Sequence, residues 1–253
     1  MEGLVYRMNF IMWRVRQVIA LLILFFLWSA LYGTKGTMLF GYSESQMMGY
    51  VFMVGLLRMV VLSSTTWEIG ANINNGNLVN ILLRPLNFFS VYIAKDLGDK
   101  ALNVGCAIVE VIVLVLMFRP PIFFQTDVGT LALFLLATVI SIAMYFFFSM
   151  ILGLVGFWTQ DYWAPRFLTF VMVEFFSGAT FPLDVLPTGL YRVIQFSPFP
   201  YMIYTPVKIY LGKANANEIL VDIGIGILWT IIMYIVARIV WAKGVKGYEA
   251  QGR

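Results

Sequence analysis

Residues Ser177 to Pro187 read SGATFPLDVLP, and this stretch ends an apolar run abruptly. Proline has no backbone N–H and restricts the residue before it, so closely spaced prolines interrupt a helix. Prolines recur here among apolar and aromatic side chains, at Pro182, Pro187, Pro198, Pro200 and Pro206. Broken apolar backbone at membrane depth is tolerated only where protein buries it or a cavity faces it. We therefore expect residues 181–212 to fold back against other helices on one side of a bilayer.

The composition places the whole chain in a membrane. Hydrophobic residues make up 61% of the 253 residues and charged residues 12%, against roughly 45–50% and about 25% in soluble domains. No polar stretch is long enough for a separate soluble domain, so we expect one all-α polytopic membrane domain over residues 1–253. Cys106 is the single cysteine and lies in an apolar run, which leaves neither a disulfide framework nor a thiol metal site.

Six apolar runs are interpreted as transmembrane helices, each of which needs about 20 mostly apolar residues. They lie near residues 18–34, 46–63, 93–118, 128–156, 166–181 and 219–241. Because an even number of crossings returns the chain to the side where it started, both termini are expected on one side. The broken segment 181–212 then lies outside the cell, between the fifth and sixth spans.

Residues 1–16 precede the first span and contain many large apolar side chains together with Arg14 and Arg16. We interpret them as a short helix lying on the inner leaflet. A cleaved signal peptide is the alternative, because a charged region followed by an apolar one has that appearance. No small-x-small cleavage site clearly follows the first run.

A polar segment separates the second and third runs. Asparagines and charged residues alternate irregularly with isoleucines and leucines over residues 65–87, and the segment ends in Arg84-Pro85 and Asn87. Such a pattern is typical of a segment that lies along the membrane interface and does not cross it.

The charge distribution indicates the orientation, because lysine and arginine accumulate in cytoplasmic segments. With the N-terminus inside, ten of the 17 Lys and Arg residues lie in or beside cytoplasmic segments and five lie outside. We therefore expect cytoplasmic termini in the cell (inner) membrane. The basic balance reflects this topology and contacts with anionic membrane lipids, and no nucleic-acid partner is expected.

Several residue types that enzymes use are missing. The chain has no histidine, which excludes Ser-His dyads, His-Glu-x-x-His zinc sites and imidazole acid–base pairs. It also has no Gly-x-x-x-x-Gly-Lys-Ser/Thr loop, so it is not expected to bind and hydrolyse ATP. We assign no catalytic residue and no metal ligand, and we expect no cofactor in this chain.

Three ionisable residues lie inside the expected spans: Arg58 in the second, Glu110 in the third and Glu174 in the fifth. An arginine at the centre of a membrane costs about 2.5–3.5 kcal/mol on insertion scales, so each charge should face the bundle or a watery path. Arg58 and Glu174 lie at similar depth, which suggests a structural ion pair. The alternatives are snorkelling of Arg58 to the inner headgroups and a role in substrate or proton handling.

The order of these elements resembles the permease subunits of type-2 ABC exporters. The resemblance covers nearly the whole chain and rests on residues 67–87 and on Ser-Gly-x-x-Phe-Pro-Leu-x-x-Leu-Pro from Ser177. It is strongest to the short paired permeases grouped with antibiotic, daunorubicin-like and viologen exporters. In that family the first segment is a coupling helix that docks on a separate ATPase, and the second begins an extracellular re-entrant hairpin.

The resemblance implies residues for each element, all of them structural. The coupling element would contain Glu68, Gly76, Leu82, Arg84 and Pro85. The re-entrant turn would contain Gly178, Phe181, Pro182 and Pro187.

The resemblance also implies the partners and the cargo. Separate ABC subunits would bind ATP and Mg, and a second six-helix permease, identical or related, would complete the translocation path. The cargo would be a hydrophobic or amphipathic compound, such as a drug, antibiotic or lipid-like molecule, moved out of the cytoplasm or the inner leaflet.

Two other classes of function remain open at this point. One is an intramembrane lipid-modifying enzyme or protease, whose polar centre would be Glu174, Glu110, Asp161 or Tyr162. The other is a membrane assembly or sensor subunit that transports nothing. An exporter permease should be encoded beside an ATPase, whereas an enzyme need not be.

Overall fold

The computed structural model describes residues 2–33, 38–161 and 163–248, without the side chains of residues 2–7, 9 and 10. These residues form helices and connecting loops, with no strand among them. The longer helices are α1 (Glu2–Leu31), α2 (Glu44–Val60), α5 (Phe88–Phe118), α6 (Val128–Leu154), α7 (Trp163–Phe176) and α10 (Ala216–Lys246). The short ones are η1 (Thr65–Trp67), α3 (Glu68–Asn74), α4 (Val79–Leu82), η2 (Val155–Phe157), η3 (Leu183–Val185), α8 (Thr188–Gln195), η4 (Phe199–Tyr201) and α9 (Tyr204–Tyr210).

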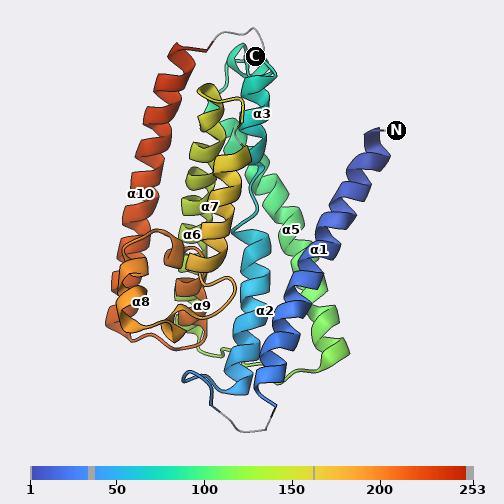
Figure 1. The fold of residues 1–253 in the computed structure, drawn as a ribbon, viewed down its shortest axis with the longest axis vertical. Helices are drawn as coiled ribbons and strands as arrows, with labels where there is room; N and C mark the ends of the chain where they lie inside the picture. The colour runs from blue at the N-terminus through green and yellow to red at the C-terminus, as the bar shows by residue number, and fades with distance from the viewer. Residues whose placement is uncertain (1, 34–37, 162, 249–253) are drawn as a thin grey trace.

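The longer helices run roughly along one axis and alternate in direction (Figure 1). One end of the bundle carries α3 and the last turns of α10, and we call it the α3 end. The other end carries α8, α9 and the first turns of α10, and we call it the α9 end. α2 packs on α1 and α5, while α6 packs on α10 and α9. The chain therefore leaves and re-enters the bundle at two polar ends.

Polar side chains start the helices at these ends. The Ser43 hydroxyl accepts a hydrogen bond from the Gln46 N–H, and the Gln46 side chain accepts one from the Ser43 N–H. Asn87 starts α5 and Asp127 starts α6 in a similar way. Such caps satisfy N–H groups that have no partner within the helix, and the sequence therefore fixes where these helices begin.

α2 is the centre of the core. Most of its side chains are buried, among them Met47, Tyr50 and Leu57. The residues from Met202 to Leu211 are also mostly buried and pack against the same cluster. A second cluster lies at the α3 end and joins α3 to α5, α6 and α10.

Four helices are long and apolar enough to cross a membrane, among the residues that the structure describes. They are Ile11–Leu31, Phe88–Phe118, Val128–Phe157 and Ala216–Lys246. A fifth is obtained if α2 and the segment Thr65–Asn74, which meet at a bend of 49°, count as one broken span. α7 coincides with the expected fifth span but has only 14 residues. Four of the six expected runs therefore coincide with helices long enough to span a membrane, whereas six full spans are not shown.

The N-terminal region differs from the expectation of a separate helix over residues 1–16. α1 continues without a break from Glu2 to Leu31, and its apolar part begins at Ile11. The reason is that Arg14, which suggested a boundary, is buried against α5. The expected end of this span at residue 34 lies outside the described residues.

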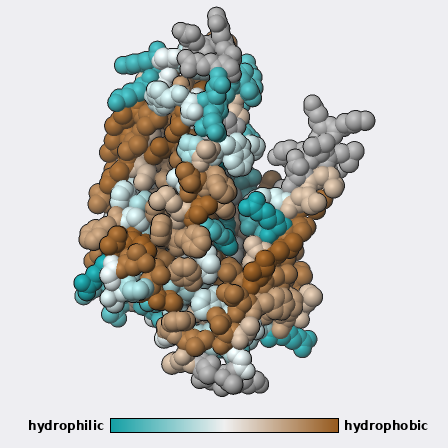
Figure 2. Space-filling view, viewed as in Figure 1, coloured by the Kyte–Doolittle hydropathy of each residue, from teal (hydrophilic) through white to brown (hydrophobic). Residues whose placement is uncertain are grey.

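The outer surface of the bundle is apolar. Figure 2 shows hydrophobic surface over much of the middle of the molecule and hydrophilic surface gathered at the α3 end. Large exposed apolar side chains line α1, α5, α7 and α10. Contiguous apolar surface of this extent requires lipid or another protein to cover it. The chain is a multi-pass membrane protein.

Candidate functional site

The α3 end exposes an apolar stretch between α4 and α5. Leu83 is 80% exposed and Leu86 is 59% exposed, and Trp67 beside α3 is 54% exposed. Every residue from Leu82 to Asn87 is exposed, including Arg84 and Pro85. We call residues 82–87 the α3-end patch. Its leucines stand at a polar end of the bundle, away from the lipid-covered sides, which is typical of a protein contact.

Charges and a turn surround this patch. Glu68 pairs with Lys95 of α5 at 3.6 Å, and both side chains are well exposed. Gly76 adopts a positive φ of 74° in the turn between α3 and α4. The turn is closed by a hydrogen bond from the Leu78 N–H to the Asn72 carbonyl at 3.0 Å. The structure thus brings Glu68, Gly76, Leu82 and Arg84 to one end of the molecule, as the resemblance implied, without showing what they contact.

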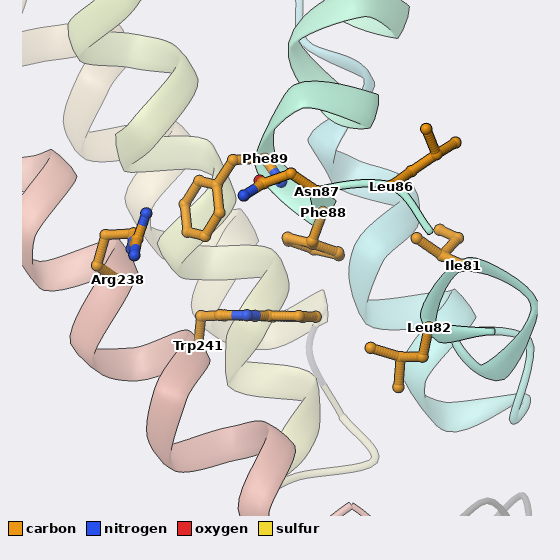
Figure 3. Close-up of a pocket in the computed structure, with 8 residues that line it drawn as sticks. All are labelled: Ile81, Leu82, Leu86, Asn87, Phe88, Phe89, Arg238 and Trp241. Atoms are coloured by element: carbon orange, nitrogen blue, oxygen red, sulfur yellow. The ribbon is translucent and has the colours of Figure 1, made fainter. Parts of the chain in front are cut away.

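A cavity of about 240 Å³ lies beside the patch, between α4, the start of α5 and α10 (Figure 3). The Phe88 ring stacks on Trp241, with centroids 3.7 Å apart, and the guanidinium of Arg238 lies over the Phe89 ring. Aromatic and cation–π contacts typically contribute on the order of 1 kcal/mol each. These contacts join the first turn of α5 to α10 along the wall of the cavity, which Leu82 also lines.

α3 rests closely on the end of α6. A Cβ atom added at Gly153 would lie 2.7 Å from the Thr66 carbonyl oxygen and 2.9 Å from the Ile69 Cβ. Such distances are shorter than any normal contact, so a side chain would force the two segments apart. The Thr66 hydroxyl also donates to the Ser149 hydroxyl at 2.7 Å. A force on α3 is therefore passed to α6 by direct contact.

The break between α2 and α3 is tied to α5 by two buried charges. The Lys100 ammonium donates to the Val60 carbonyl at 2.8 Å and to the Ser63 carbonyl at 2.5 Å. Val60 is the last residue of α2, and Ser63 lies in the break that follows it. Asp96 lies 3.4 Å from Lys100 and accepts the Thr65 N–H at 3.0 Å. Lys and Asp are rarely buried unless paired. This Asp96–Lys100 pair supplies the partners that the broken backbone lacks.

The same face of α5 holds a second buried cation. Arg14 of α1 donates to the Asn103 side-chain oxygen at 2.7 Å and lies 3.5 Å from Glu110. Asn103 in turn donates to Asp99 at 2.7 Å. Sequence reasoning missed this network, because it placed Arg14 and Lys100 in cytoplasmic segments. The signal was the spacing of four polar residues of α5, which places them on one helical face: Asp96, Lys100, Asn103 and Glu110.

Arg58 and Glu174 form an ion pair between α2 and α7, and each side chain is less than one-fifth exposed. The pair that similar depth suggested is therefore present. Together with the hydrogen bond from Arg166 to the Ser149 hydroxyl at 3.4 Å, it ties α7 to the bundle, since Val173 is the one described residue of that helix that is fully buried. Burying two opposite charges together avoids the cost of burying either alone.

The residues of the expected re-entrant turn lie where α7 ends. Gly178 has a positive φ of 81°, and its carbonyl accepts the hydroxyl of Tyr50 from α2. The Tyr204 N–H donates to the Ser177 carbonyl at 2.8 Å, which brings α9 back to the end of α7. A Cβ at Gly178 would lie 2.8 Å from the Tyr204 Cβ. Glycine is therefore required here by both conformation and space.

The prolines of this region mark the ends of its short helices. Pro182 precedes η3 and Pro187 starts α8, while Phe181 packs against the main core. Instead of crossing the bundle, the chain returns to the α9 end, where α10 begins (Figure 1). This arrangement agrees with a segment that folds back.

The loop between α1 and α2 holds this segment in place. The Tyr42 hydroxyl donates to Asp184 at 2.8 Å, and the Lys213 ammonium lies 4.5 Å from the centre of the Tyr42 ring. Burial raises the pKa of Tyr42, so its phenol stays a hydrogen-bond donor. The α9 end is thus closed by contacts between segments far apart in sequence.

The carboxylates considered for an intramembrane enzyme are not brought together. Glu110 is paired with α1, Glu174 with α2, and Asp161 accepts the Trp163 and Ala164 N–H groups at the start of α7. Tyr162 lies outside the described residues. In the part of the chain that the structure covers, no group of three or more His, Cys, Asp or Glu residues is placed to hold a metal ion.

The comparison with known families agrees with this architecture. A family model described as "ABC-2 family transporter protein" matches residues 18–252. No curated protein is significantly similar to the chain. No solved structure is significantly similar to it either.

Proposed function

The chain belongs to the ABC-2 family of transporter proteins, and on that premise we propose that it is the permease subunit of an ATP-driven exporter. Members of this family are membrane components of transport systems, and separate ABC subunits generally supply their ATP hydrolysis. The chain would lie in the cell (inner) membrane with the α3 end in the cytoplasm. Its cargo would be a hydrophobic or amphipathic compound, moved out of the cytoplasm or the inner leaflet.

The observation that carries this proposal is the α3-end patch. Leu83 and Leu86 are exposed at an end of the bundle where water, not lipid, is expected; the exposed Arg84 lies between them in sequence, and Glu68 pairs with Lys95 at the start of α3. Apolar side chains with a charged rim are the usual composition of a protein interface. An ATP-binding subunit is the partner that the family implies, and we propose that it docks here.

The contacts beneath the patch give a route for the motion. α3 touches α6 at Gly153, and the α2–η1 break is held to α5 by the Asp96–Lys100 pair. When two ATPases close on ATP, they would move α3 and α4, and these contacts would tilt α5 and α6. ATP can favour the outward arrangement only as far as the docked ATPases bind it better in that arrangement.

Other parts of the molecule fit the same proposal. α7 exposes Phe167, Phe170 and Phe175, and we propose that a second permease, identical or related, covers this helix and completes the path. Together with α8 and α9, α7 would form the fifth membrane segment and the extracellular re-entrant hairpin. The Met and aromatic residues of the bundle would suit a pliable apolar path.

Co-purification with the neighbouring ATPase tests the docking surface. We expect Leu83→Asp to weaken the complex by at least about tenfold in affinity, because it places a charge in the apolar centre of the contact. Glu68→Lys and Arg84→Glu should uncouple ATP hydrolysis from transport or weaken assembly. Met38→Asp is the matched control, because Met38 is 73% exposed on the loop at the α9 end.

The outcome is decisive in both directions. Normal assembly and coupling in Leu83→Asp, Glu68→Lys and Arg84→Glu would remove the proposed interface. Equal loss in Met38→Asp would show that the substitutions act on folding and not on docking.

A further inference from the structure

A groove of about 840 Å³ lies at the α9 end, on the other side of the bundle from the α3-end patch. Its walls come from α8, α9 and the first half of α10, which lie together in Figure 1. The volume is within the range of about 300–1,000 Å³ that small-molecule sites occupy. None of the residues used above for ATPase coupling lines it.

The floor of the groove is apolar and follows α10. Val221, Ile225, Leu228 and Trp229 line it at the spacing of one helical face. This stretch belongs to a candidate membrane span. The floor is therefore an apolar surface along which an acyl chain could lie, from the α9 end towards the middle of the membrane.

The mouth of the groove carries charges of both signs. Lys208 of α9 and Glu218 of α10 pair with each other at 3.1 Å, so they largely satisfy one another. Arg192 on α8 and Asp222 on α10 also line the groove, on different walls. Among the described residues neither of these two lies within 4 Å of an opposite charge. Asp222 stands about two turns inside a candidate membrane span, where a carboxylate without a close partner is costly, and the cation that acts on it, Lys208, is already paired with Glu218.

We infer that this groove binds a zwitterionic phospholipid from the leaflet at the α9 end. Its phosphate would pair with Arg192, its ammonium group with Asp222, and an acyl chain would lie on the floor formed by α10. One molecule would then satisfy two opposite charges that the protein leaves apart. A lipid with only a negative head would bring its phosphate towards Asp222, and an uncharged chain would leave both charges unpaired.

Native mass spectrometry of the purified protein tests this inference without any transport assay. The protein would be released from mixed micelles with equimolar phosphatidylethanolamine and phosphatidylglycerol, and the retained lipid counted. We expect the wild type to retain phosphatidylethanolamine preferentially. Arg192→Gln and Asp222→Asn should each lower its retention roughly tenfold, since each removes one charge-assisted contact.

Matched controls separate this site from lipid held all around the protein. Arg119→Gln and Asp127→Asn remove the same charges from exposed positions outside the groove, and Asn remains a good helix N-cap. Both should retain the lipid as the wild type does. The conservative variants Arg192→Lys and Asp222→Glu keep the charges and should also retain it.

Three results would overturn the inference. The first is equal retention in wild type, Arg192→Gln and Asp222→Asn, which means annular lipid only. The second is a preference for phosphatidylglycerol that depends on Arg192 alone, which means an anion site. The third is equal loss in the conservative and neutralising variants, which means that packing and not charge decides. None of these results bears on docking of an ATPase at the α3 end.

Discussion

At the scale of single residues, a charge inside the membrane is costly unless the fold gives it a partner of opposite charge. Arg58 and Glu174 come from helices more than a hundred residues apart in sequence and neutralise each other between α2 and α7. Because both residues lie at a similar depth in their expected transmembrane spans, the sequence predicted this ion pair. Arg14 and Lys100 were not predicted to be buried, because both were assigned to cytoplasmic segments, and the packing of α1 and α2 on the polar face of α5 became visible only in the fold.

A double-mutant cycle tests the Arg58–Glu174 pair. Arg58→Ala or Glu174→Ala leaves one charge unpaired in a buried place, which typically costs about 3–5 kcal/mol in soluble proteins. Either variant should therefore unfold at a lower temperature in detergent, and the double variant should recover part of the loss. Strict additivity of the two losses would contradict a functional pairing of these charges.

Lys95→Ala is the matched control for this cycle. It breaks the ion pair with Glu68, in which the side chains are 46% and 40% exposed. An exposed pair contributes at most about 1 kcal/mol, so the unfolding temperature should change little.

At the scale of elements, the break after α2 is the part that pattern analysis described least well. The polar residues 65–87 indicated a segment along the membrane interface, which stays a prediction, whereas the 49° bend and the close contact of α3 with α6 followed from no local signal. They depend on Gly153 and on the Asp96–Lys100 pair, which are supplied by α6 and α5. Local residues decide where a helix ends, but distant ones decide how its continuation is held.

Hydrogen exchange tests the tie between α5 and the α2–η1 break. Asp96→Ala removes the carboxylate that accepts the Thr65 N–H and pairs with Lys100, and a hydrogen bond to a charged group contributes about 1.5–3 kcal/mol net. The Thr65 amide should therefore exchange at least about tenfold faster. Asp99→Ala is the control, because Asp99 accepts from Asn103 one turn away. An unchanged exchange rate of the Thr65 amide in Asp96→Ala would show that Asp96 does not stabilise the segment between α2 and η1.

At the scale of the whole molecule, we propose that the α3 end docks the ATPase and that the α9 end closes the extracellular side. The α3 end presents an apolar patch between charges, and the α9 end is closed by a folded-back segment pinned by Tyr42 and Tyr50. The prolines predicted this segment from sequence. The count of spans was less predictable, because α7 has only 14 residues and is followed by the short helices η3, α8, η4 and α9.

Thiol labelling tests the orientation of the two ends. Single cysteines at Thr188 and Asn77, both exposed, are introduced in a Cys106→Ala background. An impermeant reagent added to intact cells should modify the cysteine at position 188 and should reach position 77 only after permeabilisation. The reverse result would invert the topology and place the α3-end patch outside, out of reach of a cytoplasmic ATPase.

The shortness of α7 has a mechanical consequence for the surrounding bilayer. Fourteen helical residues extend about 21 Å, whereas the hydrocarbon layer is about 30 Å thick. Where α7 meets lipid at the edge of the proposed contact with a second permease, its hydrophobic surface continues only as η3 and α8, and a bilayer adapts to such mismatch by thinning locally. Local thinning of the bilayer beside α7 shortens the distance that the polar group of an amphiphile must travel through the hydrocarbon layer. The subunit would therefore sense membrane thickness, and transport would run faster in thinner bilayers than in thick, sterol-stiffened ones.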